Sequence, residues 1–303
     1  MAFQSDLISE IISNCEGAKD SVKSRRYKCE YDIIRERYDI TTQEQARSYH
    51  KEMGRYEILS IPSPLEILES IENTILNELV KILKVMFGSI SSRSQILVVG
   101  LGNRNISADS LGTSIVKKIN ITHGLNGYPN VMAICPSVLG LTGIETYDIV
   151  KSIVDRIKPT HLVLIDSLCA GDESRLAQSI QLSNTGICPG SGIGNKRKCL
   201  DGKLAKNVIS IGVPLMIYSS TFIDGNFLNH NITIDRLNNI MQKSKKSQDF
   251  EEIKELLVDI KNSILDNHKE MIVSIKDIEE CVEILSKIIS KAINITLGIT
   301  ELK

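Results

Sequence analysis

The chain contains no tryptophan, and aromatic residues make up only 4% of its 303 residues. Surfaces that bind nucleic acid usually combine aromatic side chains for stacking with an excess of positive charge. This chain lacks the charge as well, because 36 basic and 37 acidic residues leave a net charge of −1. We therefore expect no direct nucleic-acid partner and no electrostatic attraction to an anionic membrane.

Membrane and secretion signals are also absent from the sequence. No apolar run reaches the roughly 18 residues that a membrane-spanning helix needs. The first ten residues, MAFQSDLISE, lack the basic and apolar regions of a signal peptide. These absences predict a cytoplasmic protein without a membrane partner, and its cysteines are then expected to be reduced thiols.

The seven cysteines and five histidines show no metal-ligand spacing. No two cysteines stand in a C-x-x-C arrangement, which argues against a zinc ribbon or a thiol redox motif. Cys188 and Cys199 flank a glycine-rich segment, but no histidine lies near them in the sequence, so we do not expect thiol catalysis. We expect no metal and no other cofactor.

The middle of the chain alternates short apolar runs with amphipathic stretches. Helices are predicted at 109–120 and 144–157. Strands are predicted at the apolar runs, 95–100, 130–136, 160–166 and 207–214. Uninterrupted apolar strands separated by helices are typical of parallel sheets covered on both faces. The sequence therefore predicts an α/β fold with three layers, a mostly parallel twisted sheet with helices on both faces.

The two ends of the chain add to this predicted core. We expect residues 1–93 to form an N-terminal extension with a short strand and a long amphipathic helix at 65–87. Residues 94–303 are expected to form the α/β core with C-terminal helical additions, both parts belonging to one compact domain. The helical additions are predicted at 250–265 and 275–297.

The stretch ILVVGLGNRNISADSLG, residues 96–112, looks like the start of a nucleotide-binding fold. Gly100 and Gly102 fit the pattern G-x-G-x-x-G, but Asn105 stands at the third position and no acidic residue ends the next strand. We therefore expect a sharp turn at the end of a strand rather than a phosphate site. Asp109 follows this turn, and it is either the cap of the next helix or a catalytic carboxylate.

A second carboxylate, Asp166, comes directly after the apolar run LVLI. An ionised carboxylate beside a buried strand is costly unless it is paired or used. In a parallel sheet Asp109 and Asp166 would both lie at the carboxyl edge. Two carboxylates that share one proton can activate water, one as base and the other as acid. The assignment of these roles depends on burial, which the sequence does not report.

Two further segments are candidates for substrate contacts. The segment TGICPGSGIGNKRK, residues 185–198, exceeds the usual length of a connection and ends in three cations. It is either a surface loop or a segment that lines or gates the cleft. The candidate residues there are Gly190, Ser191, Gly192, Asn195, Lys196 and Arg197. Thr142 and Glu145 have the spacing of a capping box, which would open the helix predicted at 144–157.

Together these stretches resemble the germination protease family of spore-forming bacteria. The resemblance rests on VVGLGNRNISADSLG, GLTGIET, LVLIDSL and, most specifically, IQLSNTGICPGSGIGNKRK followed by VISIGVP. GRYEILSIP and IEECVEILSKIISKAINITL also look familial, so the resemblance covers most of the chain from about Gly54 onward.

The resemblance implies an endopeptidase that initiates the degradation of small acid-soluble spore proteins during germination, in the spore core. The family's two essential carboxylates fall on Asp109 and Asp166, and its chemistry is an atypical aspartic-type hydrolysis. The same motifs contain Asn103 and Glu145, which join the candidate substrate-binding or gating residues. The resemblance further implies a self-processing zymogen with a short N-terminal propeptide, a homotetramer, and a fold related to the hydrogenase-maturation endopeptidases.

The chain also departs from the family pattern. Residues 169–179, CAGDESRLAQS, are more acidic than in the family, and Tyr218 lies near a position where the family usually carries an aspartate. Two alternatives therefore stay open. One is a metal-dependent maturation endopeptidase with Asp109, Asp166 and a histidine as ligands, and the other is a non-catalytic relative that has kept the fold.

Overall fold

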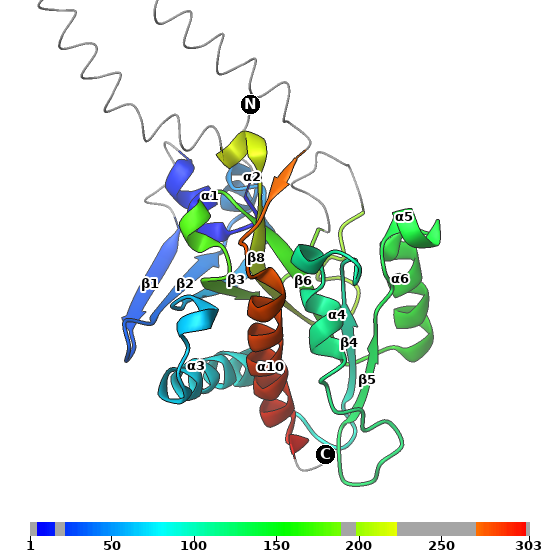
Figure 1. Ribbon diagram of the computed structural model, residues 1–303. Helices are drawn as coiled ribbons and strands as arrows, with labels where there is room; N and C mark the ends of the chain where they lie inside the picture. Colours follow the sequence, from blue (N-terminus) through cyan, green and yellow to red (C-terminus); the bar gives the residue numbers. More distant parts are fainter. Residues whose placement is uncertain (1–4, 16–21, 189–197, 223–270, 301–303) are drawn as a thin grey trace, which may run out of the picture.

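The computed structural model describes residues 5–15, 22–188, 198–222 and 271–300 (Figure 1). Its strands are β1 (Lys23–Lys28), β2 (Ile34–Ile40), β3 (Gly54–Ser60), β4 (Gln95–Gly100), β5 (Asn130–Ile134), β6 (His161–Ala170), β7 (Ser179–Ser183), β8 (Asn207–Tyr218) and β9 (Ile272–Val273). Its α-helices are α1 (Ile8–Asn14), α2 (Gln43–Ser48), α3 (Glu69–Phe87), α4 (Leu111–Val116), α5 (Leu139–Thr142), α6 (Thr146–Ile157) and α10 (Ile278–Leu297). Three short 3-10 helices are η2 (Pro64–Glu66), η3 (Ser107–Asp109) and η4 (Glu173–Arg175). The helix expected at 250–265 lies outside the described residues.

A nine-stranded sheet crosses the molecule in the order β1-β2-β3-β7-β8-β6-β4-β5, with β9 paired to the end of β8. The α/β class is confirmed, and β5, β4, β6 and β8 form the parallel part that the sequence predicts. The prediction of a mostly parallel sheet is wrong for the sheet as a whole, which is mixed because β1, β2, β3, β7 and β9 join it antiparallel. Strands β1 and β2 consist largely of charged residues and lack the apolar run by which the parallel strands were recognised. The sheet continues from β3 through β7 to β8. Strands of the expected N-terminal extension (1–93) and of the expected α/β core (94–303) therefore belong to one sheet.

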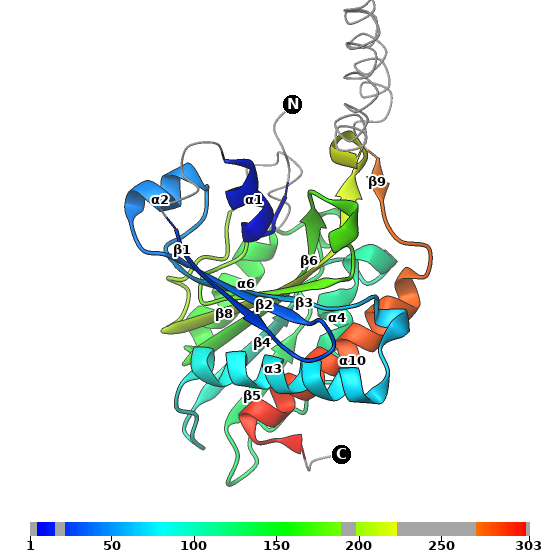
Figure 2. The same ribbon diagram turned by 90° about the vertical axis from the view of Figure 1, so that its left-hand side faces the viewer.

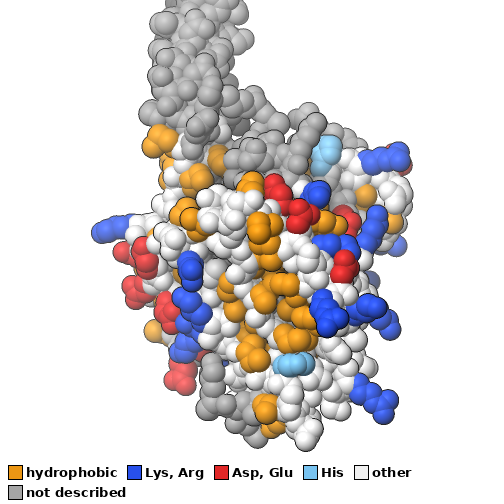
Figure 3. All heavy atoms as spheres, turned by 90° about the vertical axis from the view of Figure 1, so that its right-hand side faces the viewer, with side chains coloured by type: hydrophobic (Ala, Val, Ile, Leu, Met, Phe, Trp, Pro, Cys, Tyr) orange, Lys and Arg blue, Asp and Glu red, His pale blue; other side chains and the backbone are white. Residues whose placement is uncertain are grey.

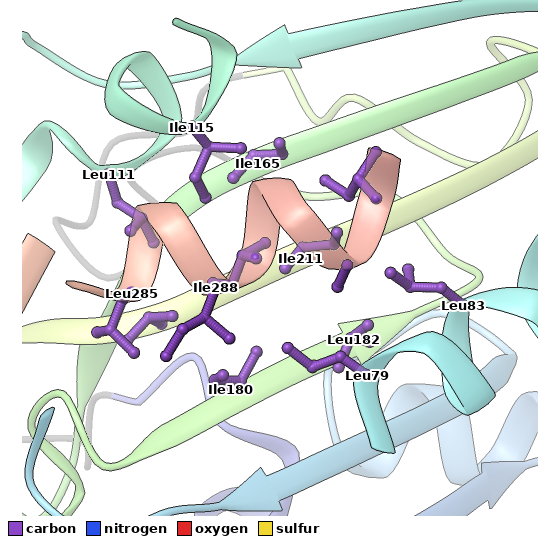
Figure 4. Packing of buried hydrophobic residues seen from close by; sticks show 14 of the residues in the cluster. Leu79, Leu83, Leu111, Ile115, Ile165, Ile180, Leu182, Ile211, Leu285 and Ile288 are labelled. Atoms are coloured by element: carbon purple, nitrogen blue, oxygen red, sulfur yellow. The ribbon is translucent and has the colours of Figure 1, made fainter. Parts of the chain in front are cut away.

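Helices cover both faces of the sheet (Figures 1 and 2). On one face α3, α4 and α10 meet the strands in the largest hydrophobic cluster of the described residues, part of which Figure 4 shows. Leu285 and Ile288 of α10 lie among Ile180, Ile211 and Leu79 there, all almost fully buried. Each such side chain contributes about 1.5 to 3 kcal/mol by leaving water, so α10 is an integral part of the core.

The opposite face is covered in two separate places. Helix α6 packs over β4 and β6 through Val150 and Val154, and α1 packs over β2 and β3 through Ile8. Between these two helices the sheet presents polar and small residues in place of apolar ones. Gln181 of β7 pairs with Gly212 of β8, and Gly212 pairs with Asp166 of β6, so these residues share one face. This gap in the apolar face is where the cleft described below lies.

The far edge of the sheet is formed by β5. Its side chains Met132 and Ile134 are only partly buried against the cluster beneath α6. A band of hydrophobic side chains bordered by basic ones runs down this side of the molecule (Figure 3). An edge strand with apolar side chains is a surface on which another chain can pair.

Candidate active site

A cleft of about 740 Å³ opens on the uncovered part of the sheet. It contains both carboxylates that the sequence singled out, Asp109 and Asp166. Asp109 comes from the turn after β4, and Asp166 comes from β6, the neighbouring parallel strand. The structure therefore brings together two residues that are 57 positions apart (166 minus 109).

The glycine turn after β4 holds Asp109 in place. Gly102 has a φ of +96°, and a Cβ at this position would lie 2.1 Å from the backbone oxygen of Asp109 and 2.8 Å from its Oδ1. At Gly100 a Cβ would lie 2.3 Å from the backbone oxygen of Gly112 in α4. Only glycine tolerates these approaches, since any side chain would push the carboxylate or the helix away. The turn thus serves to bring Asp109 against the end of β4.

Asp109 is not the cap of the following helix, so that interpretation is wrong. Asp109 ends η3, and α4 begins at Leu111 with Ser110 as its cap residue. The Asp109 Oδ2 instead accepts a hydrogen bond of 2.8 Å from the backbone N–H of Asn103. The Asn103 side chain in turn accepts from the backbone N–H of Asn105, at 3.0 Å. The turn itself therefore provides a donor to the carboxylate, which stabilises its ionised form.

Asp166 lies in a different environment. Strand β6 continues past it to Ala170, and only 7% of the residue is exposed. Burial raises the pKa of the Asp166 carboxyl well above its ordinary value, and the negative charges of Asp109 and Asp6 raise it further. A hydrogen bond of 3.0 Å from the Ser167 N–H to Oδ1 opposes the rise. Burial and the neighbouring negative charges therefore favour the protonated form of Asp166, which is less exposed than Asp109.

The N-terminal segment occupies part of the same cleft, which the sequence did not suggest. The Asp6 N–H donates to the Cys169 oxygen at 3.0 Å, and the Cys169 N–H donates to Asp6 Oδ2 at 2.9 Å. The Asp6 backbone oxygen accepts from Lys51 Nζ at 3.0 Å and from Gln181 Nε2 at 3.1 Å. Leu7, the next residue, is fully buried. A peptide is thus held beside the carboxylates mainly through its backbone.

The floor of the cleft carries a network of hydroxyl groups. The Ser183 Oγ lies 2.6 Å from the Ser210 Oγ and 2.9 Å from the Thr185 Oγ1. The Ser210 Oγ donates to the Thr185 backbone oxygen at 2.9 Å, and the Thr185 hydroxyl also donates to the Tyr56 hydroxyl at 3.3 Å. The alternation of Gln181 and Ser183 with apolar residues in IQLS was the signal that could have placed β7 and its polar face here.

Cys188 and Cys199 form a disulfide bridge that lines the cleft. The expectation that all cysteines are reduced thiols is therefore wrong for this pair. The expectation rested on the predicted compartment and on the absence of C-x-x-C spacing. The pair is instead brought together by a local antiparallel bridge between Ile187 and Leu200, which the spacing does not reveal.

The structure places the other predicted substrate-binding residues in different positions relative to the cleft. Asn103 does not line the cleft, but its N–H holds Asp109. The capping box of Thr142 and Glu145 is wrong, because Thr142 ends α5 and Glu145 precedes α6 without a side-chain cap. Glu145 stays a candidate at the start of α6, beside the cleft residue Thr146. The remaining candidates lie outside the described residues: Gly190, Ser191, Gly192, Asn195, Lys196 and Arg197.

Within the described residues, no group of three or more histidine, cysteine, aspartate or glutamate side chains is arranged to hold a metal ion. No helix in the described part of the chain has the length and apolar character needed to cross a membrane.

Comparison with known proteins identifies the family of the chain. The family model described as germination protease matches residues 13–249. The chain belongs to the germination protease family. The germination protease of Clostridium acetobutylicum is 36% identical over 279 residues, which cover 86% of this chain and 83% of that protein. The germination protease of Clostridium perfringens strain SM101 is 33% identical over 296 residues, covering 92% and 88%.

A solved structure is also similar. It is a NiFe hydrogenase maturation protease, HycI from Thermococcus kodakarensis, with 16% sequence identity and a TM-score of 0.28. The similarity covers 44% of this chain and 80% of that one. The family assignment rests on the germination proteases, whose similarity extends over most of the chain.

Proposed function

We propose that this member of the germination protease family is an endopeptidase that cleaves small acid-soluble spore proteins during germination, by activating water between Asp109 and Asp166. The observation that carries the proposal is that one cleft contains both carboxyl groups, with Asp166 buried and Asp109 accepting a hydrogen bond from the backbone N–H of Asn103. General acid and general base catalysis needs one group that donates a proton and a second group that accepts one at the same pH.

In the proposed reaction Asp109 acts as the base. Its carboxylate takes a proton from a water molecule whose oxygen attacks the scissile carbonyl carbon. Asp166 donates its proton to the carbonyl oxygen, and the Ser167 N–H stabilises the carboxylate that results. The tetrahedral intermediate then collapses as the C–N bond breaks. The leaving nitrogen takes the proton from Asp109, and the hydroxyl proton returns to Asp166.

The N-terminal segment supports the proposal of a zymogen that processes itself. Asp6 is held beside the catalytic pair through its backbone, as a peptide substrate would be. Wild-type protein is expected to lose residues that precede this segment, and Asp109→Asn is expected to keep them. Mass spectrometry of the intact chain after incubation measures this difference. The hydrophobic band on the side of the molecule that Figure 3 shows is consistent with the proposed homotetramer, and the spore core is the proposed location.

The proposal is tested by incubating a purified small acid-soluble spore protein with wild type, Asp109→Asn and Asp166→Asn, each with and without a chelator. We expect wild type to cleave in both conditions and each variant to lose about 100-fold or more of kcat. Loss of wild-type activity with the chelator would favour the metal-dependent alternative. Full activity in either variant would contradict the proposed pair. A wild type that neither cleaves the spore protein nor processes itself would favour the non-catalytic alternative.

A further inference from the structure

The disulfide between Cys188 and Cys199 joins two segments at the rim of the cleft. The Ile187 N–H donates to the Leu200 oxygen at 2.9 Å, and the Leu200 N–H donates to the Ile187 oxygen at 2.8 Å. Both cysteines line the same cleft as Asp109. The bridge thus closes a short two-stranded element that faces the catalytic carboxylates.

The two joined segments are anchored to different parts of the molecule. The segment before Cys188 continues from β7, and the Ser210 hydroxyl of β8 ties it to the sheet by bonding to the Ser183 hydroxyl and the Thr185 backbone oxygen. A Cβ on Gly186 would lie 1.9 Å from the Leu200 oxygen, so the segments are in direct backbone contact.

The segment at Cys199 belongs to the wall formed by α6. Leu200 is fully buried in the hydrophobic cluster that contains Val150 and Val154 of α6. Lys198 pairs with Asp148 of the same helix, at 3.2 Å between Nζ and Oδ1. The disulfide therefore ties the floor of the cleft at β7 to the wall at α6.

We propose that the Cys188–Cys199 bridge positions the substrate chain by fixing the distance between this floor and this wall, so that substrate binding depends on the redox state of the pair. The proposal rests on the proposed peptidase function and deepens it. A dithiol reductant transfers two electrons and two protons to the bridge, each sulfur becomes a thiol, and the dithiol closes to a cyclic disulfide. Without the bridge, the two joined segments lose more conformational entropy when a peptide binds, whereas the carboxylate pair is unchanged.

The test compares steady-state cleavage by wild type before and after reduction with dithiothreitol, and by the variant Cys188→Ser/Cys199→Ser. We expect reduction to raise KM by about threefold or more with little change in kcat. The double variant is expected to show the raised KM without reductant and no further response to it. Cys135→Ser, which removes an exposed free thiol outside the cleft, is the matched control and should respond to reduction as wild type does.

Two measurements keep this proposal separate from the peptidase function. Alkylation followed by non-reducing peptide mapping should recover residues 188 and 199 in one linked peptide, and recovery of two alkylated cysteines would overturn the proposal. Binding of the spore protein to Asp166→Asn, followed by fluorescence anisotropy, should weaken on reduction whether or not any variant is active. Equal affinity in both redox states, or an unchanged KM in the reduced wild type, would also overturn it.

Discussion

Replacement of Asp166 by asparagine should remove activity and yet stabilise the folded protein at neutral pH. The wild-type carboxyl is buried, and its pKa is raised by burial and then by the charges of Asp109 and Asp6. An unfolded chain ionises this group near its ordinary pKa of about 4, whereas the folded protein resists ionisation. Asparagine has nearly the same shape and no proton to lose, so it escapes this cost.

The magnitude follows from proton linkage. A group whose folded pKa is raised contributes its full stability below the unfolded pKa, and this contribution is lost as the pH rises towards the folded pKa. Each unit of rise corresponds to about 1.4 kcal/mol. We therefore expect the stability of Asp166→Asn relative to wild type to improve steadily as the pH rises from 4 to 7. Each gain of about 1 kcal/mol should raise the relative Tm by about 2 to 4 °C.

The assay is a thermal melt of both proteins at several pH values between 4 and 7, followed by circular dichroism. Asp155→Asn is a matched control, because Asp155 is an exposed acid on α6 that pairs with Lys151. The control reports how much of any change comes from replacing an exposed carboxylate. A Tm difference between Asp166→Asn and wild type that is constant or shrinks with rising pH would refute the inference that Asp166 holds its proton.

Two further predictions concern the surroundings of the pair. Asp6→Asn removes a like charge that raises the pKa of Asp166, so the alkaline limb of the pH profile of kcat/KM should move to lower pH, and an unmoved limb would contradict this role. Gly102→Ala should lower both stability, by about 1 to 3 kcal/mol, and activity, because its Cβ would collide with Asp109. Gly124→Ala is the control, because Gly124 also has a positive φ (+86°) but no atom near its Cβ position, so the substitution adds backbone strain alone. It should lose stability in the same melts and keep full activity in the cleavage assay.

The parallel half of the fold could be predicted from the sequence because its elements carry regular apolar patterns. Strand β4 has the predicted bounds, and α3 begins only four residues late because Pro64 starts a short 3-10 helix before it. Strand β1 is exposed, β2 is only partly buried, and both consist largely of charged residues, so hydrophobic periodicity gives little signal for them. A local pattern predicts an element only where one of its faces is buried against the core.

Local sequence patterns likewise predicted only part of the site. Asp109 and Asp166 were recognisable because each follows an apolar run, although β6 continues past Asp166 to Ala170. Asp6 reaches them through contacts with Lys51, Cys169 and Gln181, and such long-range pairings leave no trace in local spacing. The disulfide was not predicted for the same reason, because Cys188 and Cys199 are brought together by the β-bridge between Ile187 and Leu200.

The most direct test of the central claim is the protonation state of Asp166 at neutral pH. Carbon-13 NMR of protein labelled at the aspartate carboxyl carbons, with the Asp166 signal assigned by its absence in Asp166→Asn, measures this state as the pH is varied. The account predicts a protonated carboxyl at pH values where exposed aspartates have long been ionised. An Asp166 signal that titrates with the exposed carboxyls, near pH 4, would contradict the assignment of Asp166 as the acid of the pair.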